Sequence, residues 1–106
     1  MLVFKHLLNR YGPVNPDKTA RLFKLLSVGA RVKIVRLLKD RMLCVGAMAA
    51  RLDMSSAAVS QHLRILRGAG LVEAEKRGNF VHYRLNARKL AECRRVMDAL
   101  LSVARR

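Results

Sequence analysis

Several kinds of residue are scarce in this sequence of 106 residues, which has no tryptophan, two prolines and two cysteines. Cys44 and Cys93 lie far apart, so they form neither a disulfide framework nor a C-x-x-C motif. Such sparing use of cysteine is typical of reduced cytoplasmic proteins, and we expect that location. Long apolar runs are also missing. No stretch approaches the ~18 residues of a membrane-spanning helix, and charges interrupt the apolar start of the chain, unlike a signal peptide.

The residue patterns of enzymes and metal proteins are missing as well. We identify no nucleophile paired with a base, no paired carboxylates and no glycine-rich phosphate loop, and therefore expect neither an enzyme nor a bound cofactor. His6, His62 and His82 are scattered along the chain rather than spaced as metal ligands. His62 borders the apolar face of a predicted helix, and we interpret it as a structural residue.

Acidic residues are few: seven, against 22 lysines and arginines, which gives a net charge of +15. The excess is spread over the whole chain, so it belongs to the surface of a folded domain and not to a basic tail. Such a surface attracts polyanions. A membrane-surface protein would instead concentrate its charge on one basic amphipathic helix. The composition therefore favours a nucleic acid as the partner.

The hydrophobic periodicity predicts a single α+β domain over residues 1–106, with about five or six helices and one β-hairpin. The expected order is an N-terminal helix over 2–10 within a helix-and-linker segment (1–16), helices over 17–26 and from about 31 to 39, a short strand over 42–44, two helices within 45–69, a hairpin over 71–85 and a long helix over 87–104. Asp17 is the expected N-cap of the second helix, and Asn86 that of the last.

Residues 45–69 predict a helix-turn-helix. In the first helix, Val45, Met48, Ala49 and Leu52 have the spacing of one buried face. After a tight turn, Ser55 is a good N-cap for the second helix. Met54 and Val59 then occupy the positions of a hydrophobic staple. We expect Gly68 and Gly70 to end this helix in left-handed conformations.

The second helix of this pair has an apolar face and an opposite polar face that suits the major groove of DNA. Gln61 can bond adenine through two hydrogen bonds, Arg64 can bond guanine or phosphate, and Ser60 can bond base edges. Ala57 offers a methyl group to thymine, and Arg67 is placed for phosphate. Ser55 and Ser56 lie at the helix N-terminus, where backbone N–H groups attract phosphate. The alternative is an ordinary solvated helix face.

A basic hairpin follows the second helix. Strands over 71–75 and 80–85 flank the turn Lys76-Arg77-Gly78-Asn79, in which Gly-Asn favours a hairpin. Lys76 and Arg77 can reach phosphates or the adjacent minor groove. Because the helix pair, the hairpin and the charge coincide, we predict a winged helix-turn-helix that binds duplex DNA.

The last predicted helix carries an apolar stripe of Leu90, Cys93, Met97 and Leu100. This stripe is longer than a small domain needs for its own core. We therefore predict that it forms an interface between two copies of the chain.

The stretch LCVGAMAARLDMSSAAVSQHLRILRGAGLVEAEKRGNFVHYRL resembles the ArsR/SmtB family of bacterial winged-helix repressors, and the preceding LFKLLSVGARVKIVRLLKD is similar to that family's second and third helices. The similarity covers about residues 18–86, and the combination of S-x-x-x-V-S-Q-H-L-x-x-L with V-x-Y-R-L is specific. It implies a homodimer built from the terminal helices. It also implies repression by binding an inverted-repeat operator, with release when an effector binds.

The family's effector sites are incomplete in this chain. The resemblance implies a thiolate pair near the start of the first motif helix, but Cys44 is followed by Val45 and Gly46, which leaves one thiol. The last helix offers Glu92 and Asp98 without a histidine, so we expect no metal site. Two alternatives stay open: a thiol-based redox response through Cys44, and a winged-helix protein-interaction module without DNA recognition.

Overall fold

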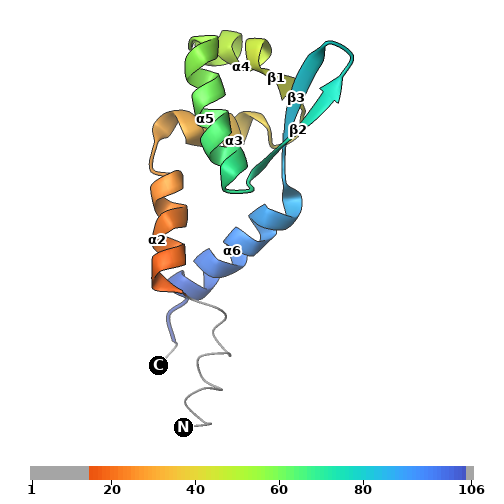
Figure 1. Ribbon diagram of the computed structural model, residues 1–106. Helices are drawn as coiled ribbons and strands as arrows, with labels where there is room; N and C mark the ends of the chain where they lie inside the picture. Colours follow the sequence, from red (N-terminus) through yellow and green to blue (C-terminus); the bar gives the residue numbers. More distant parts are fainter. Residues whose placement is uncertain (1–14, 105–106) are drawn as a thin grey trace.

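The computed structural model describes residues 15–104 of the chain. Within them, five helices and three strands follow in the order α2 (Pro16–Leu25), α3 (Gly29–Leu37), β1 (Leu43–Cys44), α4 (Val45–Leu52), α5 (Ser56–Gly68), β2 (Val72–Arg77), β3 (Phe80–Leu85) and α6 (Ala87–Leu101) (Figure 1). This order confirms the predicted α+β winged helix-turn-helix. The helix predicted for residues 2–10 lies outside the described part of the chain.

The core lies where α3, α4, α5 and the start of β2 meet. Its buried apolar residues are Ile34, Leu38, Met48, Ala49, Val59, Leu63, Leu66, Leu71, Val72 and Cys93. Helix α5 supplies three of them at the predicted positions, so its apolar face is fixed against the rest of the domain. The opposite face of α5 is consequently held outward.

The turn between α4 and α5 depends on two local features. Asp53 adopts a left-handed conformation with φ 53° and ends α4, a conformation that aspartate tolerates better than most residues. Ser55 is the N-cap of α5, because its hydroxyl oxygen accepts a hydrogen bond of 3.1 Å from the Ala58 backbone N–H. The predicted N-cap is confirmed.

The C-terminus of α5 follows the Schellman pattern. Gly70 has φ +83°, its N–H donates to the Arg67 carbonyl at 2.9 Å, and the Leu71 N–H donates to the Leu66 carbonyl at 3.0 Å. Gly68 was also expected to be left-handed, and this was wrong: it is the last helical residue. One left-handed residue is enough to close the motif, so Gly68 keeps a helical backbone.

The three strands form an antiparallel sheet in the order β1-β3-β2. The turn of the β2–β3 hairpin contains only Gly78 and Asn79, with φ +61° at Gly78. Glycine in the first position of a two-residue turn is typical of type II′, which matches the twist of the strands. The predicted four-residue turn was therefore too long: Lys76 and Arg77 belong to β2, paired with Val81 and Phe80.

The boundaries of α2 and α6 also differ from the prediction. Helix α2 is capped by Asn15, whose side-chain oxygen accepts from the Lys18 N–H at 3.1 Å, and not by Asp17. Pro16 explains the earlier start, because proline suits the first helical position. Asn86 caps α6 as predicted. That helix ends at Leu101 rather than at residue 104.

Helix α3 differs from the prediction at both ends: it begins at Gly29 rather than near residue 31, and it ends at Leu37 rather than at residue 39, with Leu38 as its C-cap.

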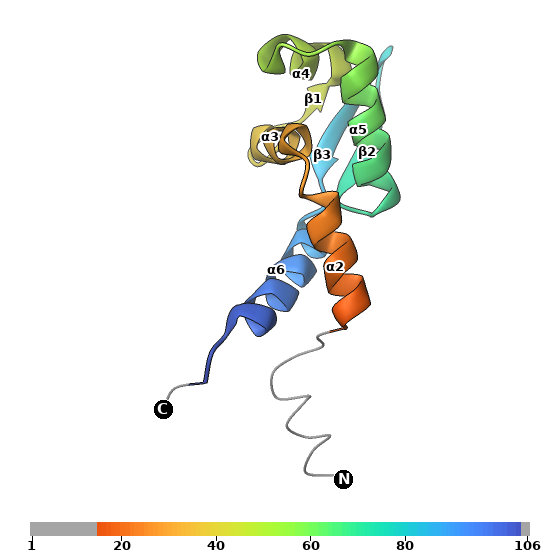
Figure 2. The ribbon, with the colours of Figure 1, turned by 90° about the vertical axis from the view of Figure 1, so that its left-hand side faces the viewer.

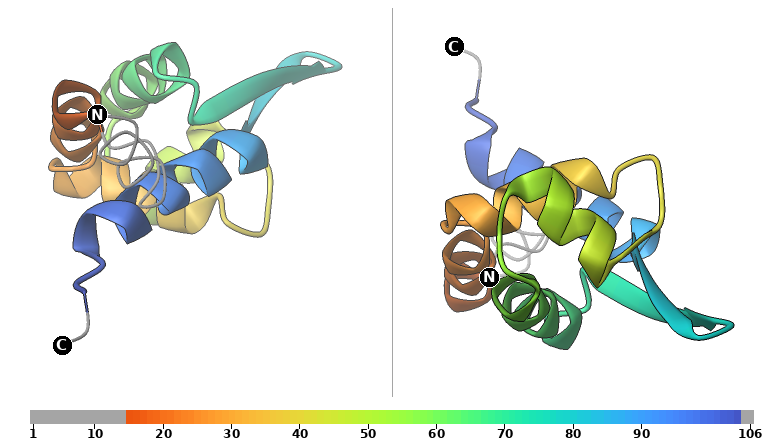
Figure 3. Two further views of the ribbon diagram at one scale, coloured as in Figure 1. Left: turned by 90° about the horizontal axis from the view of Figure 1, so that it is seen from below. Right: turned by 90° about the horizontal axis from the view of Figure 1, so that it is seen from above.

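Helices α2 and α6 lie together at one end of the molecule, and the sheet and α4 lie at the other (Figures 1 and 2). We call the β2–β3 hairpin (residues 72–85) the wing. Helix α5 and the wing lie along the same side of the molecule when it is seen from above (Figure 3). No helix within residues 15–104 is long and apolar enough to cross a membrane.

Candidate nucleic-acid interface

The nine residues predicted to contact DNA are all exposed: Ser55, Ser56, Ala57, Ser60, Gln61, Arg64, Arg67, Lys76 and Arg77. Seven of them belong to α5 or its N-cap, and two belong to the wing. Helix α5 and the wing lie along one side of the molecule (Figure 3), so the two elements that carry the candidate contacts are neighbours.

The outer face of α5 is available for base contacts. Ser60, Gln61 and Arg64 are exposed, whereas Val59 and Leu63, on the inner face, are buried. Within residues 15–104, neither Arg64 nor any other side chain of this outer face forms an ion pair. No side-chain hydrogen bond among residues 15–104 includes Ser60, Gln61 or Arg64 either, so their donors and acceptors remain available to a base edge.

The N-terminus of α5 points its first N–H groups into the same surface. The Ser55 oxygen already caps the Ala58 N–H, so the amides of Ser56 and Ala57 remain without an intrahelical partner. Together with the positive end of the helix dipole they form a site that favours phosphate.

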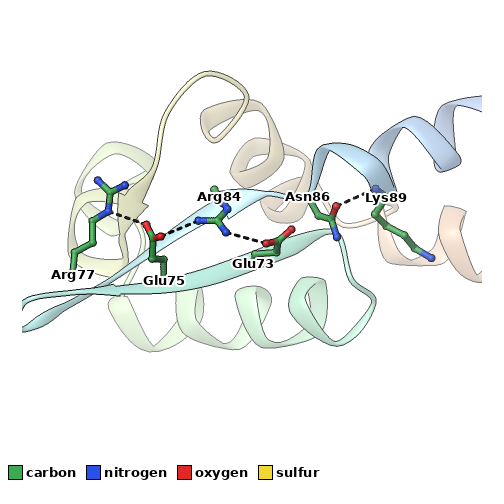
Figure 4. Close-up of polar contacts among 6 residues, drawn as sticks. All are labelled: Glu73, Glu75, Arg77, Arg84, Asn86 and Lys89. Carbon is green, nitrogen blue, oxygen red and sulfur yellow. Dashed lines mark hydrogen bonds and ion pairs between the residues drawn. The ribbon is translucent and has the colours of Figure 1, made fainter.

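The two wing cations are not equivalent. Successive residues of a strand point to opposite faces, so Lys76 and Arg77 lie on different sides of the hairpin. The Arg77 Nε donates to a Glu75 carboxylate oxygen at 2.9 Å (Figure 4). Lys76 forms no ion pair with any other residue of the described part. Its charge is therefore the more readily available to DNA.

The ion pair of Arg77 belongs to a chain of charges along the outer face of the wing. Arg84 lies between two carboxylates, 3.1 Å from Glu73 and 3.5 Å from Glu75 (Figure 4). The hydrogen bond from Arg77 is the main reason that the pKa of the Glu75 carboxyl is lowered. Glu75 thus stays ionised and keeps Arg77 turned along the strand.

His62 has the structural role expected of it. Its Nδ1 accepts a hydrogen bond of 3.3 Å from the Arg31 Nε, and the Arg31 Nη1 donates to the Leu25 carbonyl at 3.2 Å. Arg31 therefore joins α5 to the C-terminus of α2. Sequence reasoning did not find this bridge, because its partners are 31 residues apart.

Two apolar residues of the surface were also missed. Ile65 is 39% exposed on α5, one turn after Gln61, and Phe80 is 62% exposed beside the wing turn. The helical spacing from Gln61 could have revealed Ile65. No sequence pattern indicated that Phe80 is exposed, because residue type alone does not distinguish inward-facing from outward-facing strand positions near a turn.

The thiols and possible metal ligands are dispersed. Cys44 is half-buried in β1, where it pairs with His82 of β3, and Cys93 is buried, which raises the pKa of its thiol. Within the part of the chain that the structure describes, no three histidine, cysteine or acidic side chains are grouped so that they could hold a metal ion.

The stripe predicted as a dimer interface divides into two parts. Cys93 is buried and Leu90 packs against the core, so both serve the protomer itself. Met97 is half-buried, Leu100 is 44% exposed, and Leu101, which was not predicted, is 71% exposed. The unpaired apolar surface therefore lies toward the C-terminal end of α6.

A helix-turn-helix with an exposed polar helix and a basic wing is the architecture of DNA-binding transcription regulators. A family profile described as "Bacterial regulatory protein, arsR family" matches residues 29–74. The arsenical resistance operon repressor of Escherichia coli (strain K12) is 39% identical over 79 residues, which cover 74% of this chain and 68% of the relative. The chain therefore belongs to the ArsR family, and it is a DNA-binding transcription regulator.

Two further comparisons agree with this assignment. The transcriptional activator HlyU of Vibrio cholerae is 38% identical over 73 residues, 69% of this chain and 68% of that protein. A crystal structure described as a possible transcriptional regulator for arsenical resistance superposes with a TM-score of 0.70 and 36% identity, covering 76% of this chain and 84% of that one.

Proposed function

We propose that this protein is a homodimeric repressor that binds an inverted-repeat operator and is released by an effector. The observation that carries the proposal is the outer face of α5, which is polar, exposed and without ion pairs to the other described residues, beside a basic wing in a chain of net charge +15. The E. coli relative is named a repressor. We place the protein in the cytoplasm, where the chromosome of a bacterium lies.

Each side chain has a distinct part in this proposal. Gln61, Ser60 and Arg64 bond base edges in the major groove, and Ala57 contacts a thymine methyl. Ser55, Ser56 and Arg67 hold phosphates and so fix the register of α5, as phosphate contacts carry no sequence information. Lys76 reaches the backbone or the adjacent minor groove, and Arg77 follows when it leaves Glu75.

The dimeric state is supported by the apolar end of α6. Leu100 and Leu101 are exposed in the protomer, and a domain of this size gains stability from additional burial. A two-fold axis near these residues would present two copies of α5 to one face of the duplex. Two such helices meet successive major grooves about one helical turn apart, which predicts a palindromic site.

The test is a selection of binding sites from a random duplex pool with the purified full chain, followed by transcription from a promoter that overlaps the selected site. We expect a two-fold symmetric sequence and reduced transcription. A site without symmetry would contradict the dimer. Increased transcription would indicate an activator, as HlyU is named. Recovery of no sequence would favour the protein-interaction module.

A further inference from the structure

A cavity of about 710 Å³ lies between α2 and α6 and extends to the segment that joins α5 to the wing. Its volume is within the range of small-molecule sites. The apolar part of its wall includes Leu22, Leu71 and Val96, together with the buried Cys93. Of the predicted dimer stripe, only Cys93 lines the cavity, whereas Leu90, Met97 and Leu100 do not.

The charged part of the wall is strongly biased. Four cations line the cavity, and Glu92 is the one carboxylate among the lining residues. Lys18 and Lys89 lie 4.0 and 3.7 Å from Glu92. Arg21 and Arg95 form no ion pair within residues 15–104. An occupant with one negative charge would therefore meet two uncommitted guanidinium groups, from α2 and from α6.

A buried polar group also lacks a partner beside this cavity. Thr19, one of the lining residues, is only 5% exposed, and its hydroxyl oxygen makes no hydrogen bond. A buried hydroxyl group without a hydrogen-bond partner destabilises a fold. An oxygen atom of an occupant is a suitable partner for it.

We infer that this cavity binds a small organic anion with an apolar body, such as an aryl or medium-chain carboxylate or sulfonate. The apolar body packs on the leucine wall, and the anionic group bonds Arg21 and Arg95. The inference that the cavity binds such an anion is independent of the proposed function, whereas the inference that this anion is the effector rests on it.

The cavity is connected to the DNA surface through Leu71. The Leu71 N–H donates to Leu66 at the end of α5, and its carbonyl accepts from the N–H of Asn86, the N-cap of α6, at 2.8 Å. Leu71 and Ala69 both line the cavity. An occupant that shifts this segment moves the end of α5 relative to α6, and so changes the placement of α5 in a dimer.

The probe is 8-anilinonaphthalene-1-sulfonate, an aromatic anion whose fluorescence rises in apolar sites, titrated into the full chain. We expect one saturable site per chain. The double variant Arg21→Ala, Arg95→Ala should bind the probe at least tenfold more weakly. Arg94→Ala with Lys24→Ala is the matched control, because it removes two neighbouring cations that do not line the cavity, and it should bind like the wild type.

Three outcomes would overturn the inference: no saturable binding, as when a second copy or residues 1–14 of the chain fill the cavity; equal loss in both double variants; or equally tight binding of the uncharged N-phenyl-1-naphthylamine. A cooperative thermal transition in each variant verifies that the probe reports folded protein. In a second arm, the probe should weaken binding to the selected operator in the wild type and not in the cavity variant. If no operator exists, the proposed function fails while the first arm still decides the site.

Discussion

At the scale of single residues, the candidate interface separates side chains that specify a sequence from side chains that only hold the duplex. We predict that Gln61→Ala lowers the ratio of operator to random-duplex affinity by ~1–3 kcal/mol, the value of one two-bond base contact. Arg67→Ala should weaken both duplexes alike, because phosphate is present in every sequence. Equilibrium binding to the two duplexes measures both effects. Equal loss on both for Gln61→Ala would mean that α5 does not recognise bases.

A substitution of Glu75 should strengthen DNA binding rather than weaken it. Glu75→Gln removes the carboxylate that binds Arg77 and lies near bound DNA, so all duplexes should bind more tightly. The slope of log affinity against log salt should steepen by up to about 0.9, the value of one further phosphate contact. Glu92→Gln makes the same charge change on α6 and should leave DNA binding unaltered. Weaker binding by Glu75→Gln would show that Glu75 instead positions Arg77 for DNA.

The pH dependence of this pair follows from the direction of its pKa shift. The lowered pKa of Glu75 means that the pair contributes fully above the pKa of an unfolded glutamate. The contribution is lost only as the pH falls through the lower folded-state value. Mild acidification of the wild type should therefore not reproduce the effect of Glu75→Gln.

Some residues of the candidate interface could be predicted from the sequence, and others could not. The outer residues of α5 were predictable, because the helical period assigns each position to a face once Val59 and Leu63 are recognised as core. The state of Arg77 was not, since its partner Glu75 depends on strand register and on where the turn begins. Arg31 and His62 were equally hidden, because a contact between distant positions leaves no periodic signal.

At the scale of elements, the end of α5 offers a matched pair of substitutions. An added Cβ would meet nothing within 4 Å at Gly68 and would lie 3.8 Å from the Lys89 side chain at Gly70, an ordinary contact. Backbone conformation therefore decides both outcomes. Gly68→Ala should stabilise the protein by about 0.4–1 kcal/mol, and Gly70→Ala should destabilise it by roughly 1–2 kcal/mol because its φ is positive. Urea unfolding measures both, and destabilisation by both would contradict the helical assignment of Gly68.

Element types were predicted better than element ends. Periodicity identified the helices and strands of the described region, because burial imposes a period of about 3.6 or 2 on the sequence. The positions at which helices and strands end depend on which of several nearby residues caps the helix or forms the turn. Asn15 displaced Asp17 as the cap of α2 once Pro16 occupied the first turn, and Gly78 with Asn79 sufficed for the hairpin without Lys76 and Arg77.

At the scale of the whole molecule, the exposed end of α6 predicts the assembly. Leu100→Asp places a charge in an apolar contact, where it lacks a partner. We expect light scattering to show a shift from dimer to monomer and a lower affinity for the palindromic site. Ala91→Asp adds the same charge at an exposed position of α6 outside the stripe and should remain dimeric. A folded Leu100→Asp dimer would place the interface elsewhere.

The unequal support of the wing has a dynamic consequence. Strand β1 pairs only with His82 and Tyr83, so from Val81 to the turn the ladder has two strands, and two-stranded hairpins are only marginally stable in water. Amide hydrogen exchange should therefore be faster at the outer pair of Arg77 and Phe80 than at the inner pair of Glu75 and His82, where β3 also pairs with β1. Operator binding should slow exchange mainly at the outer pair. The wing tip would then become ordered on DNA, and part of its contact energy would offset the entropy lost in that ordering.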